Sequence, residues 1–120
     1  MSYKMMIIDD DEITLDLVQA LMEDDYTIIK MKSGVQALAQ LKEDPDVDVI
    51  LLDMMMPDLD GMKVLSAIKE DKRLSLIPVI LLTSLEGINF EAEGYISGAS
   101  GYVRKPIHAG LLKLKIQLLS

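Results

Sequence analysis

Several segments of the chain place a chemically capable side chain directly after a strand-like run. These side chains are Asp9 and Asp10 after the first run, then Asp53, Thr83 and Lys105 after three later ones. In an open sheet of parallel strands, the carboxyl ends share one rim, and ligands bind there. Three carboxylates, a hydroxyl and an ammonium gathered at one rim suit a divalent cation together with a phosphoryl group.

Asp9 and Asp10 are adjacent carboxylates that repel one another unless a cation lies between them. Mg²⁺ meets that requirement, because it takes oxygen ligands and commonly uses one or two protein carboxylates plus a phosphate oxygen. The alternative is a solvated loop whose carboxylates cap the following helix. We favour helix capping for Asp11 and Glu12, and both interpretations stay open for Asp9 and Asp10.

Asp53 ends the most hydrophobic strand-like run of the chain. A carboxylate at the tip of a buried strand can attack phosphorus and form an acyl phosphate, whereas capping of the strand end is the simpler alternative. Asp58 and Asp60 differ, because they lie in a Pro-Asp-Leu-Asp-Gly turn where the backbone favours such residues. We interpret those two as structural.

Thr83 and Lys105 would supply the groups that contact a phosphoryl oxygen. The Thr83 hydroxyl can donate a hydrogen bond, although a threonine at this position also serves to cap a following helix. An ammonium at Lys105 would hold the empty Asp53 carboxylate and then pair with a transferred phosphoryl group. A solvated lysine before Pro106, itself a helix-starting residue, is the alternative.

The elements that position these side chains are five strand-like runs alternating with helical patterns. The third and fourth runs are nearly continuous in Val, Ile and Leu, as in central parallel strands buried on both faces. Such an alternation predicts a doubly wound α/β architecture. The strands are expected at residues 4–8, 27–31, 47–52, 79–82 and 102–104.

Three segments between the strands show helical spacing of apolar residues. Ser33 is the expected N-cap of the second helix, and the third begins after Asp60 and Gly61. The expected buried faces are Ile13, Leu17, Ala20 and Leu21 in the first helix, Val35, Leu38, Ala39 and Leu41 in the second, and Val64, Leu65 and Ile68 in the third.

Two more helices are expected from less regular segments. Residues 86–98 contain Gly87 and Gly94, and each glycine inside a helix costs about 1 kcal/mol relative to alanine. Residues 112–118 alternate like a strand. We nevertheless expect a helix there, because a strand would extend the sheet without a cover.

Composition narrows the class of protein. The chain has 120 residues, enough for one domain with its own core, and a net charge of −8. That charge opposes nucleic-acid binding, which requires a basic surface. Cysteine is absent, which rules out disulfides and thiolate metal sites. With no signal peptide and no uncharged stretch long enough to span a bilayer, we expect a cytoplasmic protein without membrane contact.

The order of these motifs resembles the receiver domain of two-component response regulators. The resemblance rests on the Asp-Asp pair, the strand-end Asp followed by Met-Met-Met-Pro, the strand-end Thr and the Lys-Pro pair. The segment from Gly98 to Pro106 is similar to chemotaxis-type receivers in particular. The resemblance implies a flavodoxin-like, doubly wound, five-stranded parallel sheet of order 2-1-3-4-5 with five helices, forming one receiver domain over residues 1–120.

The resemblance also implies a role for each site residue. Asp53 would be phosphorylated by a histidine kinase or a histidine phosphotransfer protein. Asp9, Asp10, Asp53 and the backbone carbonyl of Met55 would hold Mg²⁺. Lys105 would bind a phosphoryl oxygen, and the peptide bond that follows it would be cis.

Signal output is implied as well. Thr83 would move toward the phosphoryl group and Tyr102, the switch aromatic, would turn inward behind it, biasing a two-state surface. A downstream protein or an attached effector domain would read that surface, and the domain would be a monomer or a weak dimer. The surface would comprise the fourth helix, fifth strand and fifth helix, around Tyr95, Tyr102, Arg104, Ile107 and Leu111.

Met55 and Leu85 each lie two residues past a site side chain, at positions that tune hydrolysis in the resembling family. Both are apolar, so neither positions an attacking water, and we predict slow loss of the phosphoryl group.

Three other classes of protein could use some of these residues. In the favoured interpretation, the domain is a switch that catalyses only its own phosphorylation and dephosphorylation. One alternative is a pseudo-receiver, which has the same fold but is never phosphorylated. A phosphatase with an aspartyl nucleophile usually carries Asp-x-Asp, but Asp53 is followed by two methionines and the Asp-x-Asp at residues 58–60 lies in a turn. A calcium loop of the Asp-x-Asp-x-Asp-Gly type is absent.

Overall fold

The computed structural model describes residues 3–56, 60–83 and 98–119 of the chain. Within these ranges five parallel strands form one sheet in the order β2-β1-β3-β4-β5, which confirms the predicted α/β class and strand order. The strands are β1 (Tyr3–Ile8), β2 (Tyr26–Met31), β3 (Val49–Asp53), β4 (Val79–Thr83) and β5 (Gly101–Arg104), and the helices are α1 (Glu12–Met22), α2 (Gly34–Glu43), α3 (Gly61–Glu70) and α5 (Ala109–Gln117).

The strands lie within two residues of their predicted positions, because their apolar runs are long and unambiguous. β3 (VILLD) and β4 (VILLT) are buried at every position, as expected for central strands covered on both faces. β2 and β5 form the two edges of the sheet and are more exposed.

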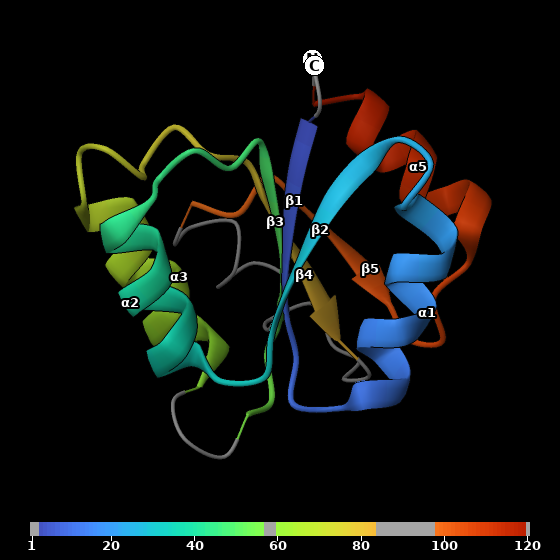
Figure 1. Cartoon of the computed structure of the whole chain (residues 1–120), viewed down its shortest axis with the longest axis horizontal. Coiled ribbons are helices and arrows are strands. Elements are labelled where there is room, and N and C mark those ends of the chain that lie inside the picture. Colours follow the sequence, from blue (N-terminus) through green and yellow to red (C-terminus); the bar gives the residue numbers. More distant parts are fainter. Residues whose placement is uncertain (1–2, 57–59, 84–97, 120) are drawn as a thin grey trace.

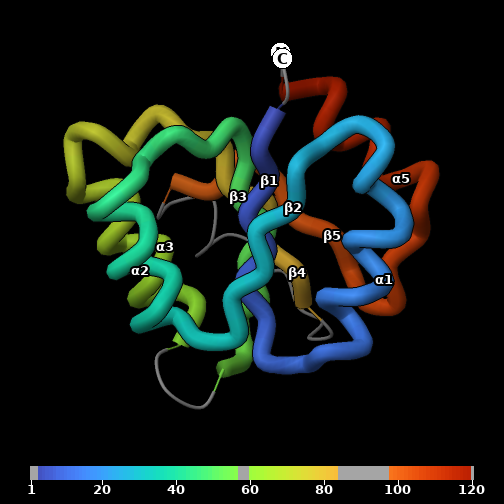
Figure 2. Tube along the Cα trace, in the orientation of Figure 1, coloured from blue at the N-terminus to red at the C-terminus, as the bar shows by residue number. Residues whose placement is uncertain are grey.

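Helices cover both faces of the sheet, as Figure 1 shows with α2 and α3 on one side and α1 and α5 on the other. Each side has its own apolar cluster. Val64, Leu65 and Ile68 of α3 belong to one cluster, and Leu112 and Ile116 of α5 belong to the other. The Cα trace in Figure 2 shows the chain passing from α1 through β2 to α2 on the opposite face, with α3 beside α2 and α5 back on the face of α1. The result is the doubly wound arrangement.

The predicted buried face was right for α3 but wrong for α1 and largely wrong for α2. Ile13 and Leu17 are exposed, at 77% and 40%, and α1 instead buries Thr14, Leu15, Val18 and Met22. Thr14 tolerates this burial because its hydroxyl donates to a carboxylate oxygen of Asp11 at 3.2 Å. In α2, Val35 and Ala39 are exposed, Leu38 is half-buried, and the buried residues are Gly34, Ala37 and Leu41.

Helix starts agree better with the sequence. Asp11, Ser33 and Asp60 are the N-caps of α1, α2 and α3, and each side chain accepts a backbone N–H of the first turn. Residues 109–117 form a helix as predicted, because Leu112 and Ile116 pack on the sheet. The predicted helix at 86–98 falls almost wholly outside the described residues, as does Asp58. In the described ranges no helix is long and apolar enough to cross a bilayer.

Candidate functional site

The register of the central strands brings the two key carboxylates together. Ile8 of β1 pairs with Leu52 of β3, so Asp9 and Asp53 follow side by side at the carboxyl ends of adjacent parallel strands. Both side chains are buried, with Asp9 at 0% and Asp53 at 4% exposure. Two buried carboxylates at one strand end require compensating charge or hydrogen bonds.

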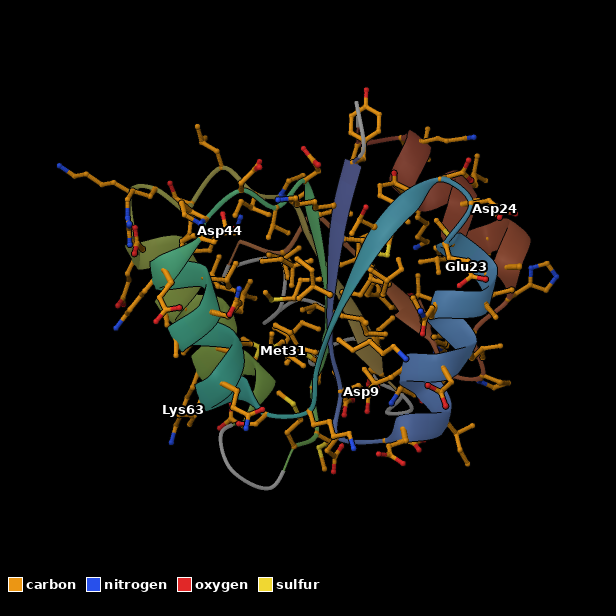
Figure 3. The ribbon with its side chains drawn as sticks, viewed as in Figure 1. Asp9, Glu23, Asp24, Met31, Asp44 and Lys63 are labelled. Carbon is orange, nitrogen blue, oxygen red and sulfur yellow. The ribbon has the colours of Figure 1, made fainter. Side chains whose placement is uncertain are left out.

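Asp9, Asp10 and Asp53 form an acidic cluster that is suited to a metal ion. Each offers one carboxylate oxygen, and these oxygens lie within 4.8 Å of one another, with Asp10 exposed and the other two buried. Hard oxygen donors of this kind match Mg²⁺, which also keeps several waters on its open side. The residues therefore fit the ion that the sequence predicted. Figure 3 shows Asp9 at one end of the sheet, and Glu23, Asp24 and Asp44 at the other.

Lys105 supplies positive charge to the acidic cluster. Its ammonium lies 2.7 Å from an Asp9 oxygen and 3.5 Å from an Asp53 oxygen. The sequence predicts this ammonium next to Asp53, whereas in the structure it lies closer to Asp9. The peptide bond from Lys105 to Pro106 is cis, which confirms the expectation drawn from the resemblance.

The surroundings of Asp53 raise the pKa of its carboxyl group well above the usual value. Burial, and then the negative charge of Asp9, raise the pKa of Asp53 from 3.8 to about 6, although the nearby charge of Lys105 offsets part of the increase. For Lys105, burial acts to lower its pKa, but the hydrogen bond to Asp9 and the charges of both carboxylates outweigh burial and raise it. The acidic cluster therefore carries more negative charge than Lys105 alone neutralises.

Thr83 and Lys105 are joined through the backbone. The Lys105 amide donates to the Thr83 carbonyl at 2.8 Å, continuing the ladder in which Thr83 pairs with Arg104. Successive side chains on a strand alternate between faces, so Thr83 shares its face with Leu81, which pairs with Tyr102. Thr83 and Tyr102 therefore lie on the same face of neighbouring strands.

The predicted switch residue, Tyr102, is half-buried at the edge of the sheet. Its ring packs against the apolar cluster on the α2 and α3 side. The ammonium of Lys115, from α5, lies over this ring at 4.7 Å from its centroid. Such a cation–π contact stabilises the ring by about 0.5–1 kcal/mol at an exposed site.

A glycine holds the backbone behind Asp53 in place. Gly61 opens α3, and a Cβ atom there would lie 2.6 Å from the Met54 Cα and 2.7 Å from the Asp53 carbonyl oxygen. Only glycine permits this approach without a backbone shift. The start of α3 thereby braces the strand end that carries the phosphoacceptor candidate.

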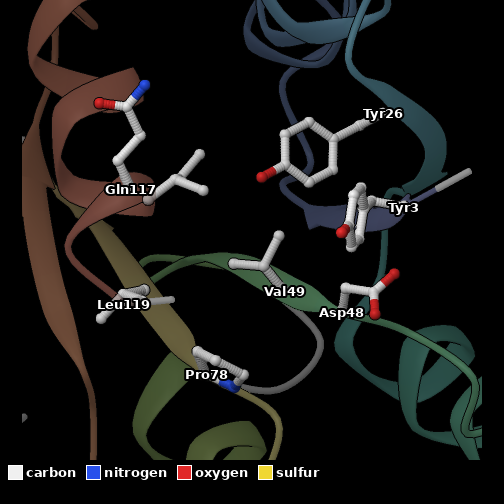
Figure 4. A pocket seen from close by; sticks show the side chains of 8 residues that line it. Tyr3, Tyr26, Asp48, Val49, Pro78, Gln117 and Leu119 are labelled. Atoms are coloured by element: carbon white, nitrogen blue, oxygen red, sulfur yellow. The ribbon is translucent and has the colours of Figure 1, made fainter.

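The opposite end of the sheet has a different character. A cavity of about 380 Å³ opens beside Tyr3, Tyr26 and Val49, the first residues of β1, β2 and β3. Figure 4 shows the two tyrosine rings side by side near Val49, with ring centroids 6.2 Å apart. The cavity lies away from the acidic cluster and contributes none of its residues.

A parallel sheet with a carboxylate cluster, a hydroxyl and a lysine at its carboxyl rim defines a phosphoacceptor class of signalling domain. The sequence pattern of the response regulator receiver domain matches residues 5–117. The chain therefore belongs to the response regulator receiver domain family, whose members are phosphorylation-dependent switches of two-component signalling.

Individual proteins agree with this assignment. The chain is 36% identical over 121 residues to the response regulator PleD of Caulobacter vibrioides, covering 100% of this chain and 26% of PleD. It is 33% identical over 108 residues to the polar-differentiation response regulator DivK of Brucella ovis, covering 89% of this chain and 87% of DivK. The chemotaxis protein CheY4 of Vibrio cholerae superposes with a TM-score of 0.93 at 25% identity, with full coverage of both chains.

Two polar side chains, Lys69 and His108, organise the structure although the sequence predicted no role for them. Lys69 donates to the carbonyls of Ser75 and Ile77 at 3.0 and 3.1 Å, which fixes the loop before β4. His108 accepts from the Leu111 amide at 3.3 Å and so caps α5. A lysine in the last turn of a helix is itself a signal for carbonyl binding, whereas nothing in the sequence singles out His108.

Proposed function

We propose that Asp53 is the phosphoacceptor of this domain and that a histidine kinase or a histidine phosphotransfer protein is the donor. The observation that carries the proposal is the Asp53 carboxylate itself. It is 4% exposed at the rim of a parallel sheet, lies 3.5 Å from a lysine and belongs to a three-carboxylate cluster. Burial with a raised pKa marks groups tuned for chemistry.

The residues proposed to hold Mg²⁺ are Asp9, Asp10, Asp53 and the backbone carbonyl of Met55. When bound, the ion would neutralise carboxylates and phosphoryl oxygens, so that negatively charged reactants can approach. The Met55 amide already lies 3.4 Å from an Asp53 oxygen, which orients the carboxylate at the strand end.

In the transfer step, an Asp53 carboxylate oxygen attacks phosphorus and the bond from phosphorus to the donor imidazole nitrogen breaks. The electron pair of that bond returns to the imidazole, and the product is an acyl phosphate on Asp53. Lys105 pairs with one phosphoryl oxygen and the Thr83 hydroxyl donates to another. Little covalent chemistry is asked of the protein, since positioning and charge neutralisation dominate phosphoryl transfer.

The proposed switch follows from the shared face of Thr83 and Tyr102. When Thr83 moves toward the phosphoryl group, it vacates space on the face that Tyr102 occupies, and the ring turns inward. Lys115 must then release the ring. The affected surface comprises β5 and α5, and the sequence adds the helix predicted at residues 86–98, which lies almost wholly outside the described residues. A partner or an attached effector reads the state of Asp53 there, in the cytoplasm.

The test is intact-protein mass after incubation with Mg²⁺ and acetyl phosphate. We expect one added phosphoryl group in the native protein and in Asp48→Asn, a matched change at the far end of the sheet. We expect none in Asp53→Asn or without Mg²⁺. A folded native protein that gains no mass, even in rapidly quenched samples, would favour a pseudo-receiver. Turnover of a small phosphate ester would instead indicate a phosphatase.

The lifetime of the phosphoryl group is a second proposal. Met55 is 59% exposed and its thioether cannot hold an attacking water, so we propose slow hydrolysis. Leu85, the other apolar position, lies outside the described residues. We expect Met55→Asn to lose its phosphoryl group about tenfold faster, a change of about 1.4 kcal/mol in the barrier, measured as decay of the added mass. Equal or slower decay in the variant contradicts the proposal.

A further inference from the structure

The cavity at the amino end of the sheet has the size of a small-molecule site. Its volume of about 380 Å³ lies within the range in which proteins bind small organic ligands. The apolar part of its lining includes Val49, Pro78 and Leu119. Figure 4 shows the rings of Tyr3 and Tyr26 on one side of the cavity and Leu119 on the other. The cavity is therefore suited to a small ligand with an apolar body.

Two tyrosine rings give the cavity an aromatic wall. Tyr3 of β1 and Tyr26 of β2 are register partners on paired strands, and their ring planes are inclined by 53°. Tyr3 is 55% exposed and Tyr26 is half-buried. Among the residues that the structure describes, a lysine lies over the ring of Tyr102, but no lysine or arginine lies over Tyr3 or Tyr26. Both rings can therefore receive a cation from outside the protein.

Asp48 brings negative charge to the same cavity and is the one charged residue among the described residues that line it. It accepts the Lys4 amide at 2.7 Å, whereas the Lys4 ammonium lies 3.4 Å from Asp46. Asp48 enters no salt bridge within the part of the chain that the structure describes. The amide orients the Asp48 carboxylate without neutralising its charge.

This negative charge acts on the aromatic wall. Burial, and then the charges of Asp25 and Asp48, raise the pKa of Tyr26. A negative charge that disfavours a phenolate favours a cation at the same place, and the net charge of −8 adds to the attraction. Lys113 borders the adjoining hollow beside Tyr26, but Asp25 lies there as well. The surroundings of the cavity thus favour a positively charged ligand over an anion.

We propose that this cavity binds a small organic ammonium ion with an apolar body. The cationic head lies against the faces of Tyr3 and Tyr26, beside the carboxylate of Asp48. Aromatic faces attract quaternary and other ammonium ions through the negative side of the ring quadrupole, and the apolar body covers Val49 and Pro78. Because the cavity shares no residue with the acidic cluster, binding there does not require phosphorylation.

The probe is benzyltrimethylammonium, which joins a quaternary ammonium head to a phenyl body. Three controls each remove one property: tetramethylammonium lacks the body, benzyl alcohol lacks the charge, and phenylacetate reverses it. Binding is measured with the full chain from two-dimensional amide NMR spectra. We expect saturable shifts at the Tyr26, Val49 and Gln117 amides, and nuclear Overhauser effects between the N-methyl protons and both tyrosine rings. Every control should bind at least fivefold more weakly.

Variants locate the site. Tyr26→Leu and Asp48→Asn should each weaken binding of the probe by fivefold or more, whereas Tyr26→Phe keeps the ring and should bind within twofold of the native protein. Asp44 also accepts a backbone amide, that of Asp46 at 3.1 Å, but lies outside the cavity lining. Asp44→Asn should therefore leave binding unchanged. Circular dichroism melts verify folding, and Tyr3→Leu, at the more exposed ring, replaces Tyr26→Leu if that variant unfolds.

Each other outcome would overturn the proposed ligand class. Equal binding of benzyl alcohol or phenylacetate would show that the cavity does not select a cation. Shifts that do not saturate, or equal effects of Asp48→Asn and Asp44→Asn, would show non-specific attraction to an acidic chain. Shifts of the same amides on dilution without the probe would assign the cavity to a second copy of the chain.

Discussion

The two ends of the sheet use polar residues in opposite ways. At the carboxyl end, Asp9 and Asp53 lie side by side and share one ammonium. At the amino end, polar groups are matched: Asp48 accepts the Lys4 amide at 2.7 Å, and the Lys69 ammonium binds two loop carbonyls. Both ends are well hydrogen-bonded, so the contrast lies in charge.

This contrast separates function from stability within one sheet. The excess negative charge at the carboxyl end costs folding free energy, and a cation that binds there would relieve it. Among the described residues, the amino end has no pair of buried carboxylates. Substitutions at the carboxyl end should therefore change phosphorylation and stability together, whereas those at the amino end should change stability alone.

The largest effect should come from Gly61→Ala. The added Cβ would meet the backbone of Met54 and Asp53 at 2.6 and 2.7 Å, and relieving this overlap should cost about 3 kcal/mol. Because the displaced backbone carries Asp53, phosphorylation by acetyl phosphate should slow as well. Gly101→Ala is the control, since nothing lies within 4 Å of its Cβ position. Urea unfolding that finds the two variants equal contradicts this explanation.

The next largest effect should be a gain in stability from Asp53→Asn. The folded pKa of Asp53 is about 6, above its ordinary value of 3.8, so the folded protein bears the cost of the charged group above about pH 6. Without Mg²⁺ the variant should be more stable by on the order of 2 kcal/mol at pH 7.5. The gain should shrink as the pH falls from 6 toward 4 and vanish well below the ordinary pKa of 3.8, where both states are protonated.

Asp48→Asn provides the comparison at the other end of the sheet. Its amide oxygen can still accept the Lys4 amide, so we expect a change below about 0.5 kcal/mol at any pH. Melting temperatures from pH 4 to 8, with and without Mg²⁺, measure both variants. A gain for Asp53→Asn that is independent of pH would show that charge is not its source.

A smaller loss should follow Lys69→Met at the amino end. Methionine keeps part of the side-chain stem that packs beside Gly98 but leaves the Ser75 and Ile77 carbonyls without their donor. We expect a loss of about 1 kcal/mol with an unchanged rate of phosphorylation. A reduced rate would mean that the loop before β4 affects the acidic cluster after all.

The smallest effect should be that of Tyr26→Phe. Burial, and then the charges of Asp25 and Asp48, raise the pKa of Tyr26, so the fold favours the neutral phenol and loses stability as the pH rises past 10. Near pH 7 the variant should differ by less than about 0.5 kcal/mol and should phosphorylate normally. Above pH 10 it should lose less stability than the native protein, as followed by circular dichroism.

The sequence was sufficient for the strands and the grouping of the site, but not for two other features. Val, Ile and Leu runs ending in polar residues located each strand, since buried parallel strands admit few other residues. For α1, apolar residues occupy more than one face, and spacing alone does not tell which face meets the sheet. Thr14 is buried and Ile13 exposed, and the burial of Thr14 is tolerated because Asp11 accepts a hydrogen bond from its hydroxyl.

The position of Lys105 between the two carboxylates was also not predictable from the sequence. The chain order places it near both carboxylates, but its preference for Asp9 depends on distances of 2.7 and 3.5 Å that only the folded backbone sets. The raised pKa of Asp53 depends on the same geometry. The pattern of residue types predicts which charged groups lie together. How strongly each carboxylate interacts with Lys105 depends on distances that only the folded structure shows.

The hydrogen bond from the Lys105 amide to the Thr83 carbonyl has a consequence for how a signal could be recorded. The two residues proposed to hold the phosphoryl group, Thr83 and Lys105, are joined by this one backbone hydrogen bond. A shift of either strand end would therefore strain or break the bond. The Lys105 amide proton is therefore a probe of the relative positions of the two strand ends. Its rate of exchange with deuterated water would report on the whole rim from a single amide.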